Sequence, residues 1–303
     1  MAKHPKILAG QVAAITGGAR GIGRAMAYAF VRQGMRVAIG DLDVEAARKT
    51  AEEIGSGTVA LELNVTDRAS VERFADEVER ALGPIDVFVN NAGIMPLSRF
   101  LEEDDATAQR TVDINLHGVL YGMKVVLPRM VARNRGHVVN VASQAGKFGF
   151  AGGATYCATK FAVVGVTEAL RQELRLMGAD GVALSLVMPA IVNTELGGGL
   201  SRPRGQKDIQ PEDVAAATVE ALQTERFEVW VPRDNQGIYT FGTLLPRRGR
   251  EAVSRALKAD RPLWAIDAGQ RRAYELRAAQ SAPSLEPGGE PAALTTGERD
   301  ADG

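Results

Sequence analysis

The sequence predicts an α/β fold: a single domain built on a doubly wound parallel sheet, followed by a C-terminal helical extension. Over the first 190 residues, short apolar runs alternate with longer segments of helical period. Strand–helix–strand repetition of this kind favours a parallel sheet. The apolar runs are nearly continuous, without apolar–polar alternation, as expected of strands that helices cover on both faces.

These patterns place each element in order. Strands are expected at 12–16, 36–40, 59–63, 85–90, 136–142, 182–188 and 227–232. Helices are expected at 22–33, 44–54, 70–82, 107–131, 156–177 and 211–223. Asp67 precedes the helical segment 70–82 and Pro211 begins the segment 211–223, and both residue types are typical of helix N-termini.

The composition excludes several classes of protein. The 303 residues are 45% hydrophobic and carry a formal net charge of −1, so no overall field attracts nucleic acid. Cys157 is the single cysteine and there are three histidines, so neither an internal disulfide nor a metal site is expected. A reducing cytoplasm is the expected compartment. No apolar run reaches the ~20 residues that span a bilayer, so no transmembrane helix is expected.

A glycine-rich segment joins the first predicted strand to the first predicted helix. Gly17, Gly21 and Gly23 allow a tight turn and let backbone amides approach a pyrophosphate, while the helix directs its positive end at the phosphates. Many glycine-rich segments are only turns, and this spacing differs from the common G-x-G-x-x-G pattern. Its position between strand and helix favours a dinucleotide site.

Asp41 follows the second predicted strand, 24 positions after Gly17. This is close to the offset at which an acidic side chain binds the adenosine ribose, although a solvated charge at a strand end is the alternative. With Asp43 beside it, the carboxylate would repel a 2′-phosphate, so we expect NAD. Arg20 could instead attract that phosphate, which leaves NADP as the alternative cofactor.

Tyr156 and Lys160 are four residues apart, so on a helix they share one face. Their ordinary pKa values, ~10 and ~10.4, are too high for base catalysis at neutral pH. An ammonium beside the phenol would lower the tyrosine pKa towards the working range. Such pairs are often surface pairs, but here Ser143 at a strand end, the glycine turn and Asp41 precede them in order.

Together these motifs resemble the short-chain dehydrogenase/reductase family in its single-domain, Rossmann-like form. The matching motifs run from Val12 to about Asp213. They are Thr-Gly-x-x-x-Gly-x-Gly at 16–23, Asn-Asn-Ala-Gly at 90–93, Asn115, Ser143, Tyr-x-x-x-Lys at 156–160 and Pro-Ala-Ile-Val-Asn-Thr at 189–194. The resemblance implies an oxidoreductase that transfers a hydride between NAD(H) and a secondary alcohol or ketone.

The resemblance also implies a role for each matched residue. Tyr156 would be the general acid/base, Lys160 would lower its pKa and bind the nicotinamide ribose, and Ser143 would hold the substrate oxygen. Asn115 would anchor Lys160 through a water. The implied cofactor contacts are Gly17, Arg20, Gly21, Ile22, Gly23, Asp41, Asn64, Val65, Asn91, Gly93, Tyr156, Lys160, Ile191, Val192 and Thr194. Asn64 stands where the family usually has aspartate, and Ala190 where it usually has glycine.

The end of the chain departs from the common family pattern. We expect residues 1–232 to form the catalytic and dinucleotide-binding domain, 233–280 a helical extension near the substrate cleft, and 281–303 a disordered acidic tail. The segment 237–264 has apolar positions enough to pack on a lid formed by 195–210. Similar extensions occur in family branches that act on lipophilic alcohols, so an apolar substrate is expected.

Some alternatives stay open. Residues 244–261 carry six basic and two acidic side chains. A basic helix can rest on an anionic membrane, but a solvated face is the commoner reason for such a pattern. An NADPH-dependent ketoreductase, for example on acyl thioesters, is the second candidate function, and a non-catalytic NAD sensor the third. A complete acid–base set argues against the sensor. A small-molecule alcohol or ketone and a homo-oligomer are the expected partners.

Overall fold

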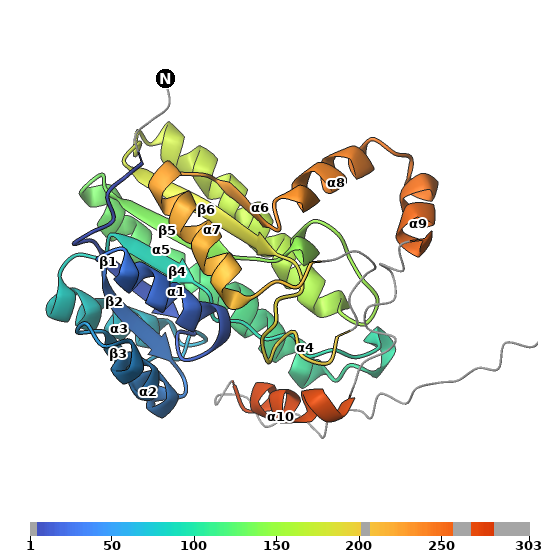
Figure 1. Cartoon of the computed structure of the whole chain (residues 1–303), viewed down its shortest axis with the longest axis horizontal. Coiled ribbons are helices and arrows are strands. Elements are labelled where there is room, and N and C mark those ends of the chain that lie inside the picture. The colour runs from blue at the N-terminus through green and yellow to red at the C-terminus, as the bar shows by residue number, and fades with distance from the viewer. Residues whose placement is uncertain (1–4, 201–206, 257–267, 282–303) are drawn as a thin grey trace, which may run out of the picture.

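The computed structural model describes residues 5–200, 207–256 and 268–281. A seven-stranded parallel sheet runs through the molecule, with helices on both faces (Figure 1). Its spatial order is β3-β2-β1-β4-β5-β6-β7, which confirms the doubly wound fold. The strands are β1 (Val12–Thr16), β2 (Arg36–Asp41), β3 (Val59–Glu62), β4 (Val87–Asn90), β5 (Gly136–Val141), β6 (Val182–Pro189) and β7 (Glu228–Val231).

Successive strand residues enter two different hydrophobic clusters. Ala14 packs in the cluster that holds Phe74 of α3 (Arg68–Leu82), whereas its neighbour Ile15 packs with Phe30 of α1 (Gly21–Arg32). A strand buried on both faces needs apolar residues at every position, which explains the continuous apolar runs. The remaining helices of the sheet layers are α2 (Val44–Ile54), α5 (Gly118–Ala132), α6 (Ala154–Leu176) and α7 (Pro211–Thr224).

The single helix predicted over 107–131 is wrong in one respect. The structure divides it into α4 (Asp105–Val112), a π-helical turn at Asp113–His117 and α5. The π turn inserts extra backbone within a continuous apolar pattern, so helical periodicity alone does not reveal it. Such turns often occur at functional positions, and this one contains Asn115.

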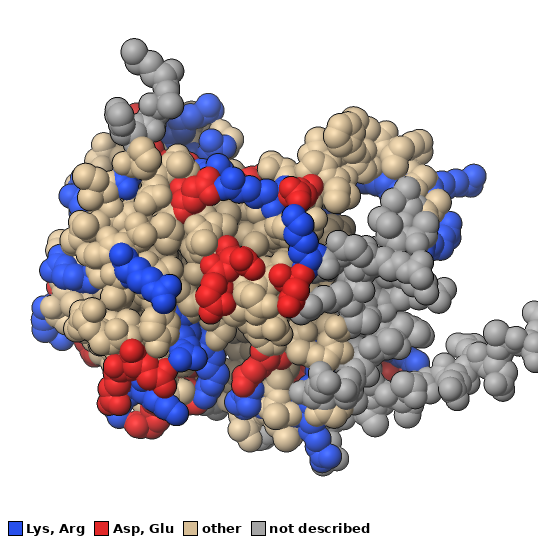
Figure 2. Space-filling view, viewed as in Figure 1, with Lys and Arg blue, Asp and Glu red and all other residues tan. Residues whose placement is uncertain are grey.

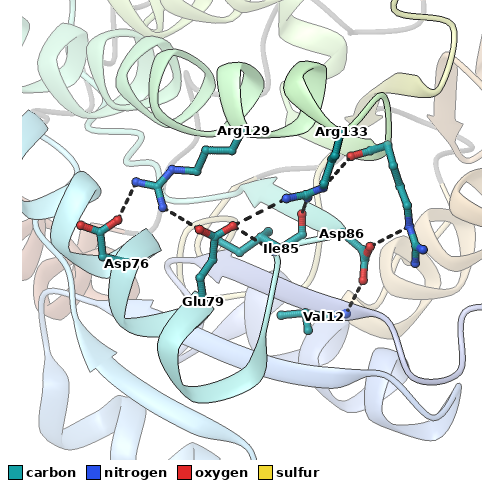
Figure 3. Close-up of polar contacts among 8 residues, drawn as sticks. Val12, Asp76, Glu79, Ile85, Asp86, Arg129 and Arg133 are labelled. Carbon is teal, nitrogen blue, oxygen red and sulfur yellow. Dashed lines mark hydrogen bonds and ion pairs between the residues drawn. The ribbon is translucent and has the colours of Figure 1, made fainter.

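A network of ion pairs and hydrogen bonds lies at the end of the sheet where the strands begin. Arg129 of α5 contacts Asp76 at 2.7 Å and Glu79 at 2.9 Å, both on α3 (Figure 3). Nearby, the Asp86 carboxylate accepts a hydrogen bond from the backbone N–H of Val12, the first residue of β1, at 3.0 Å. These contacts stabilise the amino ends of the strands. The loops that follow the strands lie at the opposite end of the sheet, so the network has a structural role.

Within its described residues, the C-terminal extension contains three helices. They are α8 (Asp234–Thr243), α9 (Arg247–Ala256) and α10 (Ala268–Ala279). Helices α8 and α9 project from the body, whereas α10 lies against a different part of it (Figure 1). Helix α8 leaves Ile238, Phe241 and Leu244 between 65% and 76% exposed. Apart from Ser281, the predicted acidic tail 281–303 lies outside the described residues.

Positive and negative side chains are interspersed over the face shown in Figure 2. Within the described ranges, no helix is both long and apolar enough to cross a membrane. The same part of the chain contains no group of three or more histidine, cysteine, aspartate or glutamate side chains that could hold a metal ion.

Candidate active site

A cavity of about 970 Å³ lies beyond the carboxyl ends of the strands. Its walls come from the segments that follow each of the strands β1 to β6, and the strand order reverses at the neighbouring β1 and β4. This is where ligands bind in open parallel sheets. All of the residues predicted for catalysis or cofactor binding line it except Gly23 and Asn115.

The glycine turn has the geometry that its sequence predicts. Gly17 and Gly21 have φ values of +64° and +52°, a region that favours glycine. A Cβ on Gly23 would lie only 2.2 Å from the carbonyl oxygen of Gly17, so the turn folds back directly onto α1. No side chain caps the N-terminus of α1 and no acidic residue occupies its first turn. Its backbone N–H groups can therefore receive an anion.

Asp41 lies at the end of the cavity beside this turn. Its carboxylate accepts hydrogen bonds from the backbone N–H groups of Ala19 and Asp43, both at 3.1 Å. Burial raises the pKa of Asp41, and the two backbone bonds oppose that shift. Arg20 forms an ion pair with Asp43 at 2.5 Å. The arginine that could have attracted a 2′-phosphate is thus engaged by a neighbouring carboxylate.

Asn64 replaces the family's usual aspartate without disturbing the local turn. Its Oδ1 accepts hydrogen bonds from the backbone N–H and the hydroxyl of Thr66, at 3.0 and 2.8 Å. An aspartate oxygen would accept the same two bonds. Val65 lies beside Asn64 in the cavity wall. Asn91 also lines the cavity, and its Nδ2 donates to the carbonyl oxygens of Thr16 and Gly17, which joins the end of β4 to the glycine turn.

Ser143, Tyr156 and Lys160 lie together at the other end of the cavity. Ser143 lies two residues after the end of β5 and caps a short 3-10 turn by accepting a hydrogen bond from the Ala145 N–H at 3.1 Å. Tyr156 lies in the first turn of α6 and is hydrogen-bonded to Ser143. Lys160 lies one turn later and its Nζ donates to the Val141 carbonyl at 3.0 Å.

The expected direction of the tyrosine pKa is wrong in this structure. Burial raises the pKa of Tyr156 to about 12, and the hydrogen bond with Ser143 opposes that shift only in part. Burial also lowers the pKa of Lys160 to about 8. The lysine Nζ lies 5.6 Å from the centre of the tyrosine ring. Both side chains are withdrawn from water, and the cost of burying a charge is the largest cause of each shift.

Asn115 lies behind the cavity wall and is fully buried. Its Nδ2 donates to the Ile94 carbonyl and its Oδ1 accepts from the Ile94 N–H, both at 2.8 Å. A third, longer contact of 3.3 Å joins Nδ2 to the Thr159 hydroxyl, next to Lys160. The direct contacts of Asn115 therefore hold the segment after β4, which carries Gly93 into the cavity.

The loop after β6 closes the remaining side. Ile191, Val192 and Thr194 line the cavity, and Thr194 lies beside Gly21 at the start of α1. Ala190, which replaces a usual glycine, does not have a positive φ, so its methyl group strains nothing. Its backbone N–H donates to the Val231 carbonyl at 2.9 Å.

Comparison with known proteins agrees with this geometry. Residues 11–204 match the family model described as short chain dehydrogenase. The chain belongs to the short-chain dehydrogenase family. It is thereby an oxidoreductase of that family, and a nicotinamide cofactor is the group that its cavity accommodates.

Three similar proteins illustrate the range of this dehydrogenase family. Sorbitol dehydrogenase of Cereibacter sphaeroides is 42% identical over 212 residues, which cover 67% of this chain and 82% of that protein. Retinol dehydrogenase 10-A of Danio rerio is 30% identical over 301 residues, covering 88% of each. A short chain dehydrogenase/reductase from Burkholderia phymatum, solved in complex with NAD, superposes with a TM-score of 0.72 at 28% identity, covering 78% of this chain and 93% of that one.

Two residues that this short-chain dehydrogenase presents to the cavity region were missed from sequence. Arg271 of α10 is only 2% exposed and donates to the carbonyl oxygens of Met95 (2.8 Å) and Leu196 (2.9 Å). The hydroxyl of Tyr274 accepts a hydrogen bond from the Met95 N–H at 2.6 Å. Arg271, Tyr274 and Ala278 are all buried and recur at intervals of three and four, a helical spacing that could have revealed this face.

The sequence predicted that the segment 237–264 packs on the loop 195–210, but these contacts come from a later helix. Arg271 reaches Leu196, and its Nη1 also donates to the Gly198 carbonyl at 3.1 Å. The helix that holds this part of the 195–210 loop is α10, which lies beyond the segment 237–264 that the sequence indicated. Residues 201–206 and 257–264 lie outside the described residues. From the segment 237–264, Ile238, Tyr239 and Leu245 line the cavity.

The dehydrogenase has an apolar wall beside Ser143 and Tyr156. Met95, Leu97, Ala145 and Cys157 form a small buried cluster with Tyr156, and Phe150, Leu196 and Leu200 pack against it. Cys157 thus has a packing role, and burial raises the pKa of its thiol. The end of the cavity nearest the acid–base residues is therefore largely hydrocarbon.

Proposed function

We propose that the protein transfers a hydride between NAD(H) and an apolar secondary alcohol or ketone. The observation that carries the proposal is a single cavity that has Asp41 at one end and the Ser143–Tyr156–Lys160 group at the other. A dinucleotide is long enough to need both ends. When bound, its nicotinamide accepts or supplies the hydride.

The side chains would then handle the proton and the substrate oxygen. Ser143 would orient that oxygen, and Tyr156, hydrogen-bonded to Ser143, would take the proton from the alcohol or return it to the ketone. Lys160 would bind the nicotinamide ribose. Asn115 would keep the segment after β4 in place through its two bonds to Ile94, and would anchor Lys160 through a water.

Two features favour NAD over NADP. Asp41 and Asp43 lie where the adenosine ribose is expected, and a 2′-phosphate would meet their negative charge. Arg20, the nearest candidate for binding that phosphate, is paired with Asp43 at 2.5 Å. A phosphate would have to compete with this pair.

The apolar wall favours a substrate with a hydrocarbon body. Met95, Phe148, Phe150, Leu196 and Ile238 line the cavity. The relatives' names point in two directions, since one names sorbitol and the other retinol. A polyol would leave its hydroxyls facing this wall without partners, which costs free energy, whereas a hydrocarbon body loses nothing there.

A substrate panel tests the reaction. NADH formation or consumption is followed by absorbance with aliphatic, terpenoid, steroid and retinoid alcohols and ketones, with polyols, and with acetoacetyl thioesters. Tyr156→Phe should lower kcat by ~10²–10⁴ because the ring stays and the transferable proton is lost. The dissociation constant for NADH should not change. Tyr28→Phe on α1, remote from the cavity, is the matched control. Turnover that survives in Tyr156→Phe would contradict the assignment.

Binding measurements test the cofactor. Wild-type protein should bind NADH more tightly than NADPH. Asp41→Ala should raise the dissociation constant of NADH and reduce the difference in affinity between the two cofactors, because the carboxylate both binds the ribose and repels the 2′-phosphate. A wild-type preference for NADPH, together with turnover of an acyl thioester, would replace this proposal by the NADPH-dependent ketoreductase.

A further inference from the structure

Helix α10 also carries Arg277, an exposed residue at the rim of the cavity. It follows Tyr274 by three positions, which places it near the same helix face. Its Nη2 lies 2.5 Å from the Glu195 carboxylate, and both residues line the cavity. The extension therefore contacts the end of the cavity that holds the glycine turn as well as the substrate end.

The surroundings of Arg277 identify which part of the cavity it faces. Glu195 follows Thr194, whose Cγ2 lies 3.4 Å from the position a Cβ would take on Gly21, the first residue of α1. Asp43 also lines the cavity. The hydrogen bond from Arg20 is the main cause that lowers the pKa of Asp43, and the charge of Arg277 adds to it. Arg277 therefore contacts Glu195 in the loop that adjoins the N-terminus of α1, and its charge reaches Asp43 after β2.

This is the part of the cavity where negative charge is expected. The uncapped N-terminus of α1 is the position that a dinucleotide's pyrophosphate takes in folds of this kind. Arg20 is engaged by Asp43, so the pyrophosphate gains from a second cation. A guanidinium suits that role because its planar N–H groups match two phosphate oxygens at once.

The present partner of Arg277 is easily exchanged. The Arg277 side chain is 44% exposed and the Glu195 side chain 59% exposed. An ion pair this open to water contributes little, so moving the guanidinium from Glu195 to a phosphate costs little. Arg271 and Tyr274 keep α10 in place meanwhile, through their bonds to the backbone of Met95.

We propose that Arg277 binds the pyrophosphate of the nicotinamide dinucleotide, so that the C-terminal helix α10 is part of the cofactor site. The proposal rests on the proposed function only in requiring that a nicotinamide dinucleotide binds this cavity. It does not depend on the substrate or on the choice between NAD and NADP, since both contain the pyrophosphate.

The experiment measures dissociation constants in the full-length protein, by NADH fluorescence and by calorimetry with ADP-ribose and adenosine. Removing one charge-assisted contact in Arg277→Ala should raise the dissociation constants of NADH and ADP-ribose about tenfold. Adenosine, which lacks the pyrophosphate, should bind as before. Arg277→Lys keeps the positive charge but lacks the paired N–H groups of the guanidinium, so its dissociation constants should lie between those of wild type and Arg277→Ala. Arg272→Ala, exposed on the same helix, is the control and should bind like wild type.

The Glu195→Gln variant distinguishes two roles for Arg277: binding the pyrophosphate, or stabilising the loop through its ion pair with Glu195. If Arg277 binds the pyrophosphate, this variant releases the guanidinium and leaves NADH affinity unchanged or tighter. NADH affinity that falls as much in Glu195→Gln as in Arg277→Ala would overturn the proposal, as would an Arg277→Ala variant with wild-type affinity or with equal losses for adenosine. Wild-type protein that binds no nicotinamide cofactor at all would instead overturn the proposed function.

Discussion

The side chain of Asn115 and the backbone of Ile94 exchange two hydrogen bonds of 2.8 Å, one in each direction. The Asn115 amide therefore pairs with the backbone N–H and C=O of Ile94 as a neighbouring strand would, just after β4 ends. Asn115 reaches this position because a π turn separates α4 from α5. One buried side chain thus links an irregular helix to the wall of the cavity.

Replacing Asn115 with alanine should destabilise the protein. The buried N–H and C=O of Ile94 would each lose a partner, at a cost of about 1–3 kcal/mol per group. Urea unfolding of wild type and Asn115→Ala measures the change, with Gln172→Ala on the exposed face of α6 as the matched amide control. A stability equal to that of the control would show that Ile94 finds other partners.

Replacing Gly23 with alanine should disrupt the cofactor end of the cavity. The new Cβ would lie 2.2 Å from the Gly17 carbonyl oxygen, so the glycine turn must open. We expect a lower melting temperature and a large loss of NADH affinity. Gly165→Ala on α6 is the control, since nothing lies within 4 Å of its Cβ position. Alanine there should stabilise the helix by up to about 1 kcal/mol. A Gly23→Ala variant with wild-type NADH affinity would contradict the role of the turn.

His137 should make stability depend on pH. Burial lowers its pKa to about 4 from 6.5, and its Nε2 lies 2.8 Å from the Ser185 hydroxyl. As the pH falls from 6.5 to 4, the unfolded chain takes up a proton that the folded protein does not, so the free energy of unfolding falls by up to about 3 kcal/mol.

Unfolding curves between pH 7.5 and 4 for wild type and His137→Gln isolate this effect. Carboxyl groups titrate in both proteins, so the difference between the curves reports the histidine. The free energy of unfolding of His137→Gln should decline less steeply as the pH falls. Parallel curves for the two proteins would contradict the prediction.

Two truncations should separate the parts of the extension. A chain that ends at Ser281 keeps every contact described for α10, so its activity and melting temperature should match those of the whole protein. A chain that ends at Pro232 loses α8, α9 and α10, including the bonds of Arg271 to Met95 and Leu196. It should show a higher KM for bulky apolar substrates. Kinetics and thermal unfolding of both chains decide, and equal behaviour would remove the support that the extension lends to an apolar substrate.

Local patterns were sufficient for most of the fold. Each strand from β1 to β7 lies within two residues of its predicted ends, because a strand buried on both faces must be apolar throughout. Gly17 and Gly21 could be predicted because a tight turn ahead of a helix requires a backbone that other residues avoid. Tyr156 and Lys160 could be paired because four residues on a helix bring two side chains to one face.

Other features depend on contacts between residues far apart in the chain. Met95 and Tyr274 are 179 positions apart, and no local pattern states that α10 folds back over the cavity. The π turn at Asp113–His117 changes no apolar spacing, so only the packed structure reveals it. The pKa of Tyr156 was expected to fall and instead rises to about 12, because every element packed around the ring contributes to its removal from water.

The sequence by itself determined the order of strands and helices and the residue types at the site, since these depend on near neighbours. The tertiary structure decided which backbone groups those side chains bind, how far they are removed from water, and that the C-terminal helix shares the cavity.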